Sequence, residues 1–295
     1  MAARPRFNVS SVYPFQMRIL ITGIRGQLGQ ALQARLPDAV GCDLPEIDIT
    51  QPEAVEATVE TCRPELIIHC AALTDVDGAA RDPTLAYRVN GMGTQNVAIA
   101  AARAGAALAY ISTNEVFDGL KAEPYWEYDP PRAINAYGQS KLAGEWFVTH
   151  LTSRFYIVRI AWLAAPGGRN FIHRIQQLAD ERGQLKAVTD EVANPTFVGD
   201  LAEALARLID TGRYGIYHLT NAGYCSRYDY ARKILALTGR GHIPVEPITR
   251  AEYPRPSTPP PFTPLANTAA AALGIELPPW EEALARFLET KGKGG

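Results

Sequence analysis

Tyr137 and Lys141 are the pair of residues in this sequence best suited to moving a proton. They lie four positions apart in AYGQSK, so on a helix their side chains share one face. A phenol has a pKa near ~10, too high for easy proton exchange at neutral pH. A neighbouring ammonium favours the phenolate and lowers that pKa, so Tyr137 could serve as an acid or a base. This spacing also arises by chance on helix surfaces, so its meaning depends on what surrounds it.

A second polar group lies in ISTNEVFDG, where a short apolar stretch meets a polar turn. At the end of a parallel strand, the Thr113 hydroxyl could donate to the same substrate oxygen that Tyr137 protonates. The alternative is that Thr113 only caps the turn. Asn114 adds an amide at the same place. We therefore predict a catalytic set of Tyr137, Lys141, Thr113 and Asn114.

The stretch TGIRGQLG has the composition of a dinucleotide-binding turn, and it lies between the apolar RILI and the helix-like QALQARL. Gly23 permits the tight turn and Gly26 lets the backbone approach a pyrophosphate. The start of the helix supplies amide donors and partial positive charge. We expect the whole turn to bind the cofactor, namely Gly23, Arg25, Gly26, Gln27, Leu28 and Gly29.

The choice between NADH and NADPH depends on two residues with opposite tendencies. Asp43 follows Gly23 by about 20 residues, where a carboxylate can accept hydrogen bonds from the adenosine ribose and repel a 2'-phosphate. Arg25 could instead pair with that phosphate, unless it is an ordinary exposed arginine. We expect NADPH or NADH as the cofactor, and the sequence leaves both open.

These residues require a fold that brings strand ends together. From Met17 to Trp162, apolar stretches alternate with helix-like ones, as in a parallel sheet covered on both faces. We predict a doubly wound α/β fold over residues 17–163, with some later segments returning to it, and a smaller substrate-binding cap over 164–295. Six prolines from Pro254 to Pro264 exclude a regular helix or inner strand there. Residues 1–16 are predicted to be a disordered extension, with Met17 a plausible alternative start.

The composition excludes several classes of partner. Lys and Arg total 29 against 31 Asp and Glu, which argues against nucleic acid and favours a small molecule. No apolar run has membrane-spanning length. The five histidines are dispersed and the cysteines have no zinc-like spacing, so we expect no metal. Reduced thiols indicate a cytoplasmic protein; the four cysteines are Cys42, Cys62, Cys70 and Cys225.

The GxxGxxG turn, the hydroxyl residue at a strand end and the YxxxK pair together resemble the extended short-chain dehydrogenase/reductase superfamily. Within it, the sequence most resembles the dTDP-4-dehydrorhamnose reductases, over nearly everything after residue 16. The motifs that carry this resemblance are GxxGQxG at 23–29, DIT at 48–50, AAxTxVD at 71–77, YGxxKxxGE at 137–145, RxxW at 159–162 followed by NF at 170–171, NPT at 194–196 and GIYHLTN at 215–221.

The resemblance implies a Rossmann-like domain with a C-terminal substrate domain, and NAD(P)H-dependent reduction of the 4-keto group of a dTDP-linked deoxysugar. Tyr137 would give the proton, Thr113 would steady the developing alkoxide and Lys141 would tune Tyr137. A homodimer is also expected. Besides the glycine turn and Asp43, the expected cofactor residues are Asp48, Ile49, Ala71, Ala72, Thr74 and Asn90, together with the catalytic Tyr137 and Lys141, of which Lys141 can hold the cofactor's ribose. Besides Thr113 and Asn114, the expected sugar-pocket residues are Val76, Trp162, Asn170 and Phe171.

The chain departs from the family pattern at positions expected to face the sugar nucleotide. Asn114 replaces an Asp and Glu115 replaces an aromatic residue. The other departures are Pro259 for Arg, Thr263 for Ser and Arg227 for Trp. Two alternative functions are an epimerase or dehydratase of the same superfamily, which would retain its cofactor through turnover, and a non-catalytic dinucleotide-binding regulatory subunit. The intact Thr113, Tyr137 and Lys141 argue against the second.

Overall fold

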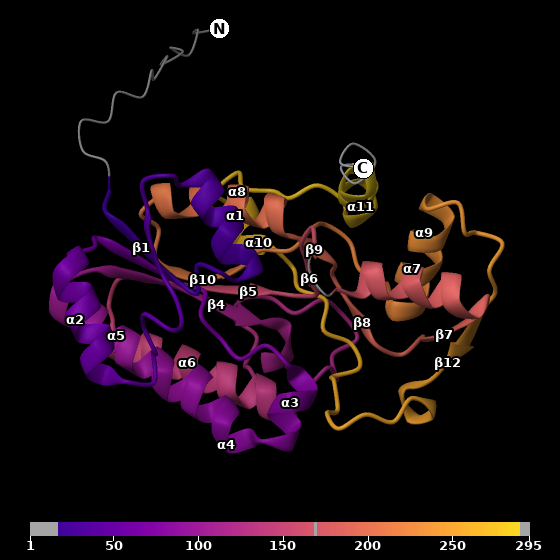
Figure 1. The fold of residues 1–295 in the computed structure, drawn as a ribbon, viewed down its shortest axis with the longest axis horizontal. Helices are drawn as coiled ribbons and strands as arrows, with labels where there is room; N and C mark the ends of the chain where they lie inside the picture. Colours follow the sequence, from indigo (N-terminus) through magenta and orange to yellow (C-terminus); the bar gives the residue numbers. More distant parts are fainter. Residues whose placement is uncertain (1–16, 168–169, 290–295) are drawn as a thin grey trace, which may run out of the picture.

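A six-stranded parallel sheet forms the centre of the computed structural model, which describes residues 17–167 and 170–289 (Figure 1). The predicted doubly wound α/β fold is confirmed. The predicted disordered extension, residues 1–16, lies outside the described residues. In spatial order the strands are β10 (Gly215–His218), β5 (Phe155–Ile160), β4 (Ala107–Thr113), β3 (Leu66–His69), β1 (Ile19–Thr22) and β2 (Val40–Cys42).

The direction of winding changes between β1 and β3. The chain passes from β1 to β2 on one side and then places β3 on the other side of β1. All the strands of the sheet are parallel, so their carboxyl ends lie along one edge. In such sheets a ligand binds beyond the carboxyl ends of the strands, at the point where the winding direction changes.

Helices cover both faces of the sheet because the central strands are apolar on both sides (Figure 1). One buried apolar cluster joins the sheet to α1 (Gln27–Arg35), α8 (Val198–Asp210) and α10 (Thr268–Ala271). Another joins it to α2 (Pro52–Cys62), α5 (Thr94–Ala104) and α6 (Ala136–Leu151). Between β3 and α5 lie α3 (Val76–Arg81), α4 (Pro83–Ala86) and the π-helix η1 (Tyr87–Gly93).

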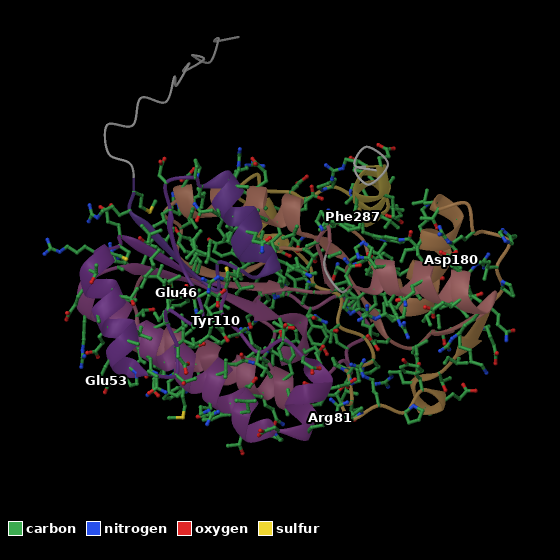
Figure 2. All side chains as sticks on the ribbon, in the orientation of Figure 1. Glu46, Glu53, Arg81, Tyr110, Asp180 and Phe287 are labelled. Carbon is green, nitrogen blue, oxygen red and sulfur yellow. The ribbon has the colours of Figure 1, made fainter. Side chains whose placement is uncertain are left out.

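A third apolar cluster lies among elements that follow β5 in the chain, several of which are drawn at the right of Figure 1. Figure 2 shows Asp180 and Phe287 in this part, and Tyr110 of β4 in the part built on the sheet. The Pro-rich segment, all of which the structure describes, contains isolated bridges in place of helix or strand. The remaining elements of the described chain are α7 (Phe171–Arg182), α9 (Arg227–Leu237), α11 (Trp280–Glu289), the 3-10 turns η2 (Asn114–Val116) and η3 (Arg250–Glu252), and the strand pairs β7 (Leu185–Val188) with β12 (Val245–Ile248), β6 (Leu163–Ala164) with β9 (Thr196–Phe197), and β8 (Val192–Ala193) with β11 (Cys225–Ser226).

Candidate active site

The predicted catalytic residues meet at the carboxyl edge of the sheet. Thr113 ends β4, and its side chain lies near enough to the Tyr137 phenol, on the first turn of α6, to affect the pKa of that phenol. The Thr113 hydroxyl also accepts a bond from the Glu115 amide at 3.2 Å, so it caps the turn as well. Asn135 caps α6 by accepting from the Gly138 amide at 2.8 Å. Because a Cβ on Gly138 would lie 2.0 Å from the Glu115 carbonyl oxygen, only glycine allows this close approach.

Burial controls the ionisation of Tyr137 and Lys141. It raises the pKa of Tyr137, and the charge of Glu115 raises it further, whereas Thr113 opposes the change. Burial also lowers the pKa of Lys141 to about 7. The Lys141 ammonium lies 4.2 Å from the centre of the Tyr110 ring. The expected lowering of the phenol's pKa is therefore not found: desolvation raises this pKa and keeps Tyr137 protonated.

The buried Lys141 should make stability depend on pH. Its pKa is about 7 in the folded chain against an ordinary 10.5, so the unfolded chain binds more protons between these values and stability rises with pH across that window. We expect Lys141→Met to be more stable than the wild type at pH 6, by on the order of 5 kcal/mol, with the difference falling below about 1 kcal/mol near pH 10. Urea unfolding at both pH values measures this, and the exposed Lys186→Met is the control. Parallel pH dependence in wild type and Lys141→Met would contradict it.

A buried ion pair fixes the helix that carries Tyr137 and Lys141. Arg159 of β5 donates to both carboxylate oxygens of Glu145 on α6, at 2.9 and 2.7 Å. The Ser112 hydroxyl of β4 donates to the same carboxylate at 2.5 Å. Both members of the pair are less than a tenth exposed. The network thus joins α6 to two central strands directly beneath the catalytic edge.

The glycine turn has the geometry that a pyrophosphate requires. Gly23 has a φ of 73°, and a Cβ on Gly29 would lie 2.3 Å from the Gly23 carbonyl oxygen. Gly26 begins α1 without a side-chain cap, so the first amides of this helix are available to an anion. Gln27 and Leu28 form the first residues of that helix. These features fit a bound dinucleotide.

The loop after β3 is held against α6 by Asn90. This side chain accepts from the Leu73 amide at 2.8 Å and donates to the Leu73 carbonyl and the Ser140 hydroxyl, at 3.0 and 2.9 Å. The Ser140 hydroxyl donates to the Tyr137 carbonyl at 2.7 Å. The loop contains the predicted cofactor residues Ala71, Ala72 and Thr74, so Asn90 connects the expected cofactor side to the catalytic helix.

Two other predicted cofactor residues follow β2. The Asp48 carboxylate accepts from the amide and hydroxyl of Thr50, at 2.9 and 2.8 Å, and these bonds lower its pKa despite partial burial. Ile49 is buried, and its carbonyl accepts from Asn96 at 2.9 Å. Their side chains therefore shape the loop, while their contact with a cofactor stays a prediction.

A cavity of about 1340 Å³ lies beside this edge, and half of the residues predicted to bind the sugar line it. Trp162, Asn170 and Phe171 line it, whereas Val76, Thr113 and Asn114 do not. Trp162 has a φ of 41°, an uncommon backbone conformation for an aromatic residue. The Asn170 side chain caps α7 by accepting from the His173 amide at 3.1 Å.

The family of the chain is shown by comparison with known proteins. Residues 17–292 match the family described as "RmlD substrate binding domain". The chain belongs to this RmlD family. It is 37% identical to a dTDP-4-dehydrorhamnose reductase of Mycobacterium tuberculosis, over 92% of each chain. The crystal structure of the Bacillus anthracis dTDP-4-dehydrorhamnose reductase in complex with NADP is 39% identical, with a TM-score of 0.90, and the match covers 94% of this chain and all of that one. The NAD complex of UDP-glucose 4-epimerase from Thermus thermophilus has 21% identity and a TM-score of 0.81 over 95% of this chain and all of that one, which shows a shared fold.

Two departures from the RmlD family pattern touch each other. The Asn114 amide donates to the Thr263 hydroxyl at 2.6 Å, and both side chains are buried. A third departure, Arg227, lies 3.6 Å from the centre of the Trp162 ring and donates to Glu191 at 2.8 Å. These departures therefore concentrate between the catalytic edge and the cavity.

Glu115 is a site residue to which sequence reasoning gave no role. Burial raises the pKa of its carboxyl to about 7, with Glu191 adding to the shift, and the Asn135 amide that donates to it at 2.6 Å opposes it. The signal in the sequence was its presence where the RmlD family pattern has an aromatic residue. A second missed feature is Asp77, which accepts from Arg255 and Ser257 and so holds the Pro-rich segment against α3.

The described residues include neither a candidate metal cluster nor a helix suited to crossing a membrane. Within residues 17–167 and 170–289 no group of three or more His, Cys, Asp and Glu side chains could hold a metal ion. In the same residues, every helix is too short or too polar to cross a membrane.

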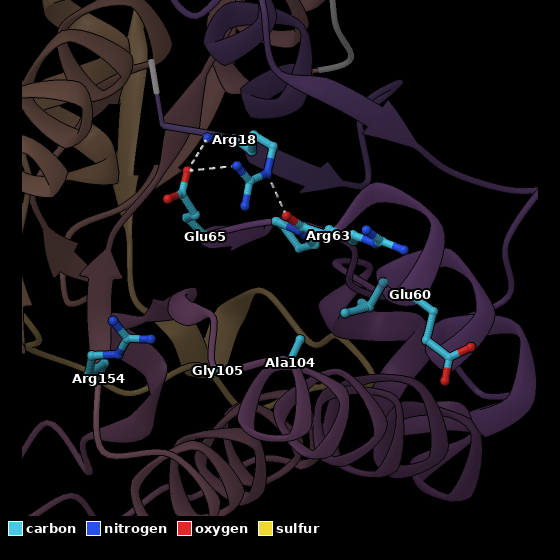
Figure 3. Close-up of a pocket in the computed structure, with 9 residues that line it drawn as sticks. Arg18, Glu60, Arg63, Glu65, Ala104, Gly105 and Arg154 are labelled. Atoms are coloured by element: carbon cyan, nitrogen blue, oxygen red, sulfur yellow. Dashed lines mark hydrogen bonds and ion pairs between the residues drawn. The ribbon is translucent and has the colours of Figure 1, made fainter. Parts of the chain in front are cut away.

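Another hollow, of about 720 Å³, lies at the opposite edge of the sheet (Figure 3). Arg18, Glu65 and Arg154 line it, each just ahead of a strand. Arg18 and Glu65 pair there at 3.7 Å. Because α/β sheets bind their ligands beyond the carboxyl ends of the strands, we assign the site to the other edge.

Proposed function

We propose that the protein catalyses the NAD(P)H-dependent reduction of the 4-keto group of a nucleotide-linked deoxysugar. The observation that carries this proposal is the meeting of Thr113, at the end of β4, with Tyr137, on the first turn of α6, at the edge where the glycine turn also lies. The relatives named dTDP-4-dehydrorhamnose reductase support a dTDP-linked substrate. The NADP in one of these structures supports the cofactor class.

Each catalytic residue has a separate task. When bound, the reduced nicotinamide supplies the hydride. The Tyr137 phenol, kept protonated by burial, donates its proton to the substrate's carbonyl oxygen. The Thr113 hydroxyl donates to the same oxygen as negative charge develops there. Lys141, when protonated, stabilises the phenolate that Tyr137 becomes.

The chain's own groups would hold the two ligands on either side of this pair. The first amides of α1 suit the pyrophosphate, and the loop containing Ala71 and Thr74 lies beside the catalytic helix. The cavity at Trp162 and Phe171 suits the sugar nucleotide, in accordance with a substrate-binding role for residues 164–295. A homodimer also belongs to this proposal. Since the four cysteines are free, we place the protein in the cytoplasm.

Asn114 offers a test of the substrate class. In Asn114→Asp, the new carboxylate can accept hydrogen bonds from the hydroxyl groups of Thr113 and Thr263. Hydrogen bonds to a charged acceptor are stronger than those to a neutral amide. We expect kcat/KM towards a dTDP-linked 4-keto sugar to rise by on the order of tenfold, equivalent to about 1.4 kcal/mol in the barrier. Steady-state kinetics measure this, with Thr263→Ser as the control. An unchanged or lower rate would mean that Asn114 is suited to another substrate.

The function itself is tested by product analysis with NADH and NADPH against a panel of nucleotide-linked keto sugars. We expect stoichiometric oxidation of the cofactor and a 4-hydroxy product. Purified protein carrying tightly bound oxidised nicotinamide, with no net oxidation, would favour an epimerase or dehydratase. Binding of the cofactor without turnover on any keto sugar would favour the regulatory subunit.

A further inference from the structure

The Arg25 guanidinium, in the glycine turn, is held by a carboxylate from the loop after β2. Its Nη1 and Nη2 atoms donate to the two oxygens of Glu46 at 2.7 and 2.5 Å. Nη1 also donates to the Leu44 carbonyl. Figure 2 labels Glu46, which lies in the part of the molecule built on the sheet. Arg25 is therefore already engaged in a bidentate ion pair with Glu46.

The same loop carries a second carboxylate, that of Asp43. It accepts from the backbone amides of Arg25 and Leu44, each at 2.9 Å. An acidic side chain at this point, just after the second strand, lies where the adenosine ribose of a dinucleotide binds. The ribose side of the site thus contains two carboxylates and one guanidinium, and each carboxylate contacts Arg25.

A 2'-phosphate would bring roughly 1.5 to 2 further negative charges to this place. The Arg25 guanidinium could bind this phosphate in a bidentate geometry. To do so it must leave Glu46. The Arg25 and Glu46 side chains are 54% and 60% exposed, and exposed ion pairs are weak, so this exchange is feasible but carries a cost.

We propose that Glu46 sets the cofactor preference by competing with the 2'-phosphate of NADPH for the Arg25 guanidinium. This inference rests on the proposed NAD(P)H-dependent function. Asp43 acts in the same direction, because it accepts from a free 2'-hydroxyl and repels a phosphate. Asp43→Ala is accordingly expected to weaken the binding of NADH more than the binding of NADPH. Glu46 thus lowers the affinity for NADPH and leaves the affinity for NADH unchanged.

Direct binding measurements test this without any sugar substrate. Dissociation constants of NADH and NADPH are compared by calorimetry for the wild type, Glu46→Gln, Arg25→Gln and the double variant. Glu53→Gln, an exposed carboxylate on α2, controls for the change in net charge. We expect Glu46→Gln to lower the dissociation constant of NADPH by about fivefold and to change that of NADH by less than about twofold. A change of this size is what the loss of an exposed, competing ion pair can give. In the Arg25→Gln background, Glu46→Gln should have no further effect on NADPH.

Three results would overturn the inference. One is an equal change for both cofactors in Glu46→Gln. Another is the same gain in the Glu53→Gln control, and the third is a full Glu46→Gln effect in the absence of Arg25. A wild type that binds neither cofactor would instead remove the proposed function itself, so the two failures are distinguishable.

Discussion

Tyr137→Phe is expected to lower kcat by on the order of a thousandfold, the usual contribution of a positioned general acid. The substitution removes one oxygen, the phenol oxygen whose pKa the neighbouring Thr113 lowers. The ring and its packing on the first turn of α6 are preserved, so the affinity for NADPH should change by less than about twofold. Steady-state kinetics and calorimetry of the same preparation measure both quantities.

Tyr128→Phe is the matched control, because Tyr128 is 76% exposed. It should retain wild-type kcat. If Tyr137→Phe kept more than a tenth of the activity, the proton would have to come from another group. A parallel loss of cofactor affinity would instead indicate a structural role for the phenol.

Glu145→Gln is expected to cost about 3–5 kcal/mol in the free energy of unfolding, as the loss of one member of a buried ion pair does. It leaves the Arg159 guanidinium almost fully buried without its counter-charge. Urea unfolding at neutral pH measures the loss. Because the pair joins α6 to β4 and β5, we also expect kcat to fall as the helix shifts.

Two further variants make this result decisive. The double variant Glu145→Gln with Arg159→Met removes both charges, and it should recover part of the lost stability even where the single variant fails to fold. Glu246→Gln breaks the exposed pair with Lys186 and should cost less than about 1 kcal/mol. A loss below about 1 kcal/mol for Glu145→Gln itself would contradict the assigned role.

Periodic sequence patterns predicted the sheet and the catalytic helix well. The strands β1, β3 and β4 are buried along their whole length and apolar up to their last one or two residues, and the stretch AYGQSKLAGEWFVTHL coincides with α6 at Ala136–Leu151. Parallel strand ends necessarily share one edge, so the meeting of Thr113 with Tyr137 also followed from the sequence.

Contacts across long stretches of chain could not be predicted. Asn114 meets Thr263, 149 positions later, and Asp77 meets Ser257, 180 positions later. Both partners lie in the Pro-rich segment, which has no periodicity from which to read its path. The depressed pKa of Lys141 also escaped prediction, because it arises from burial, which YxxxK spacing does not reveal.

The most direct test of the account is the fate of the hydride. NADPH deuterated at the transferable C4 position of the nicotinamide is incubated with the protein and a dTDP-linked 4-keto-6-deoxysugar, and the product is examined by NMR. We predict one deuterium on C4 of the sugar for each NADPH oxidised. A product without deuterium at C4, or a sugar changed without oxidation of NADPH, would contradict the assignment as a reductase.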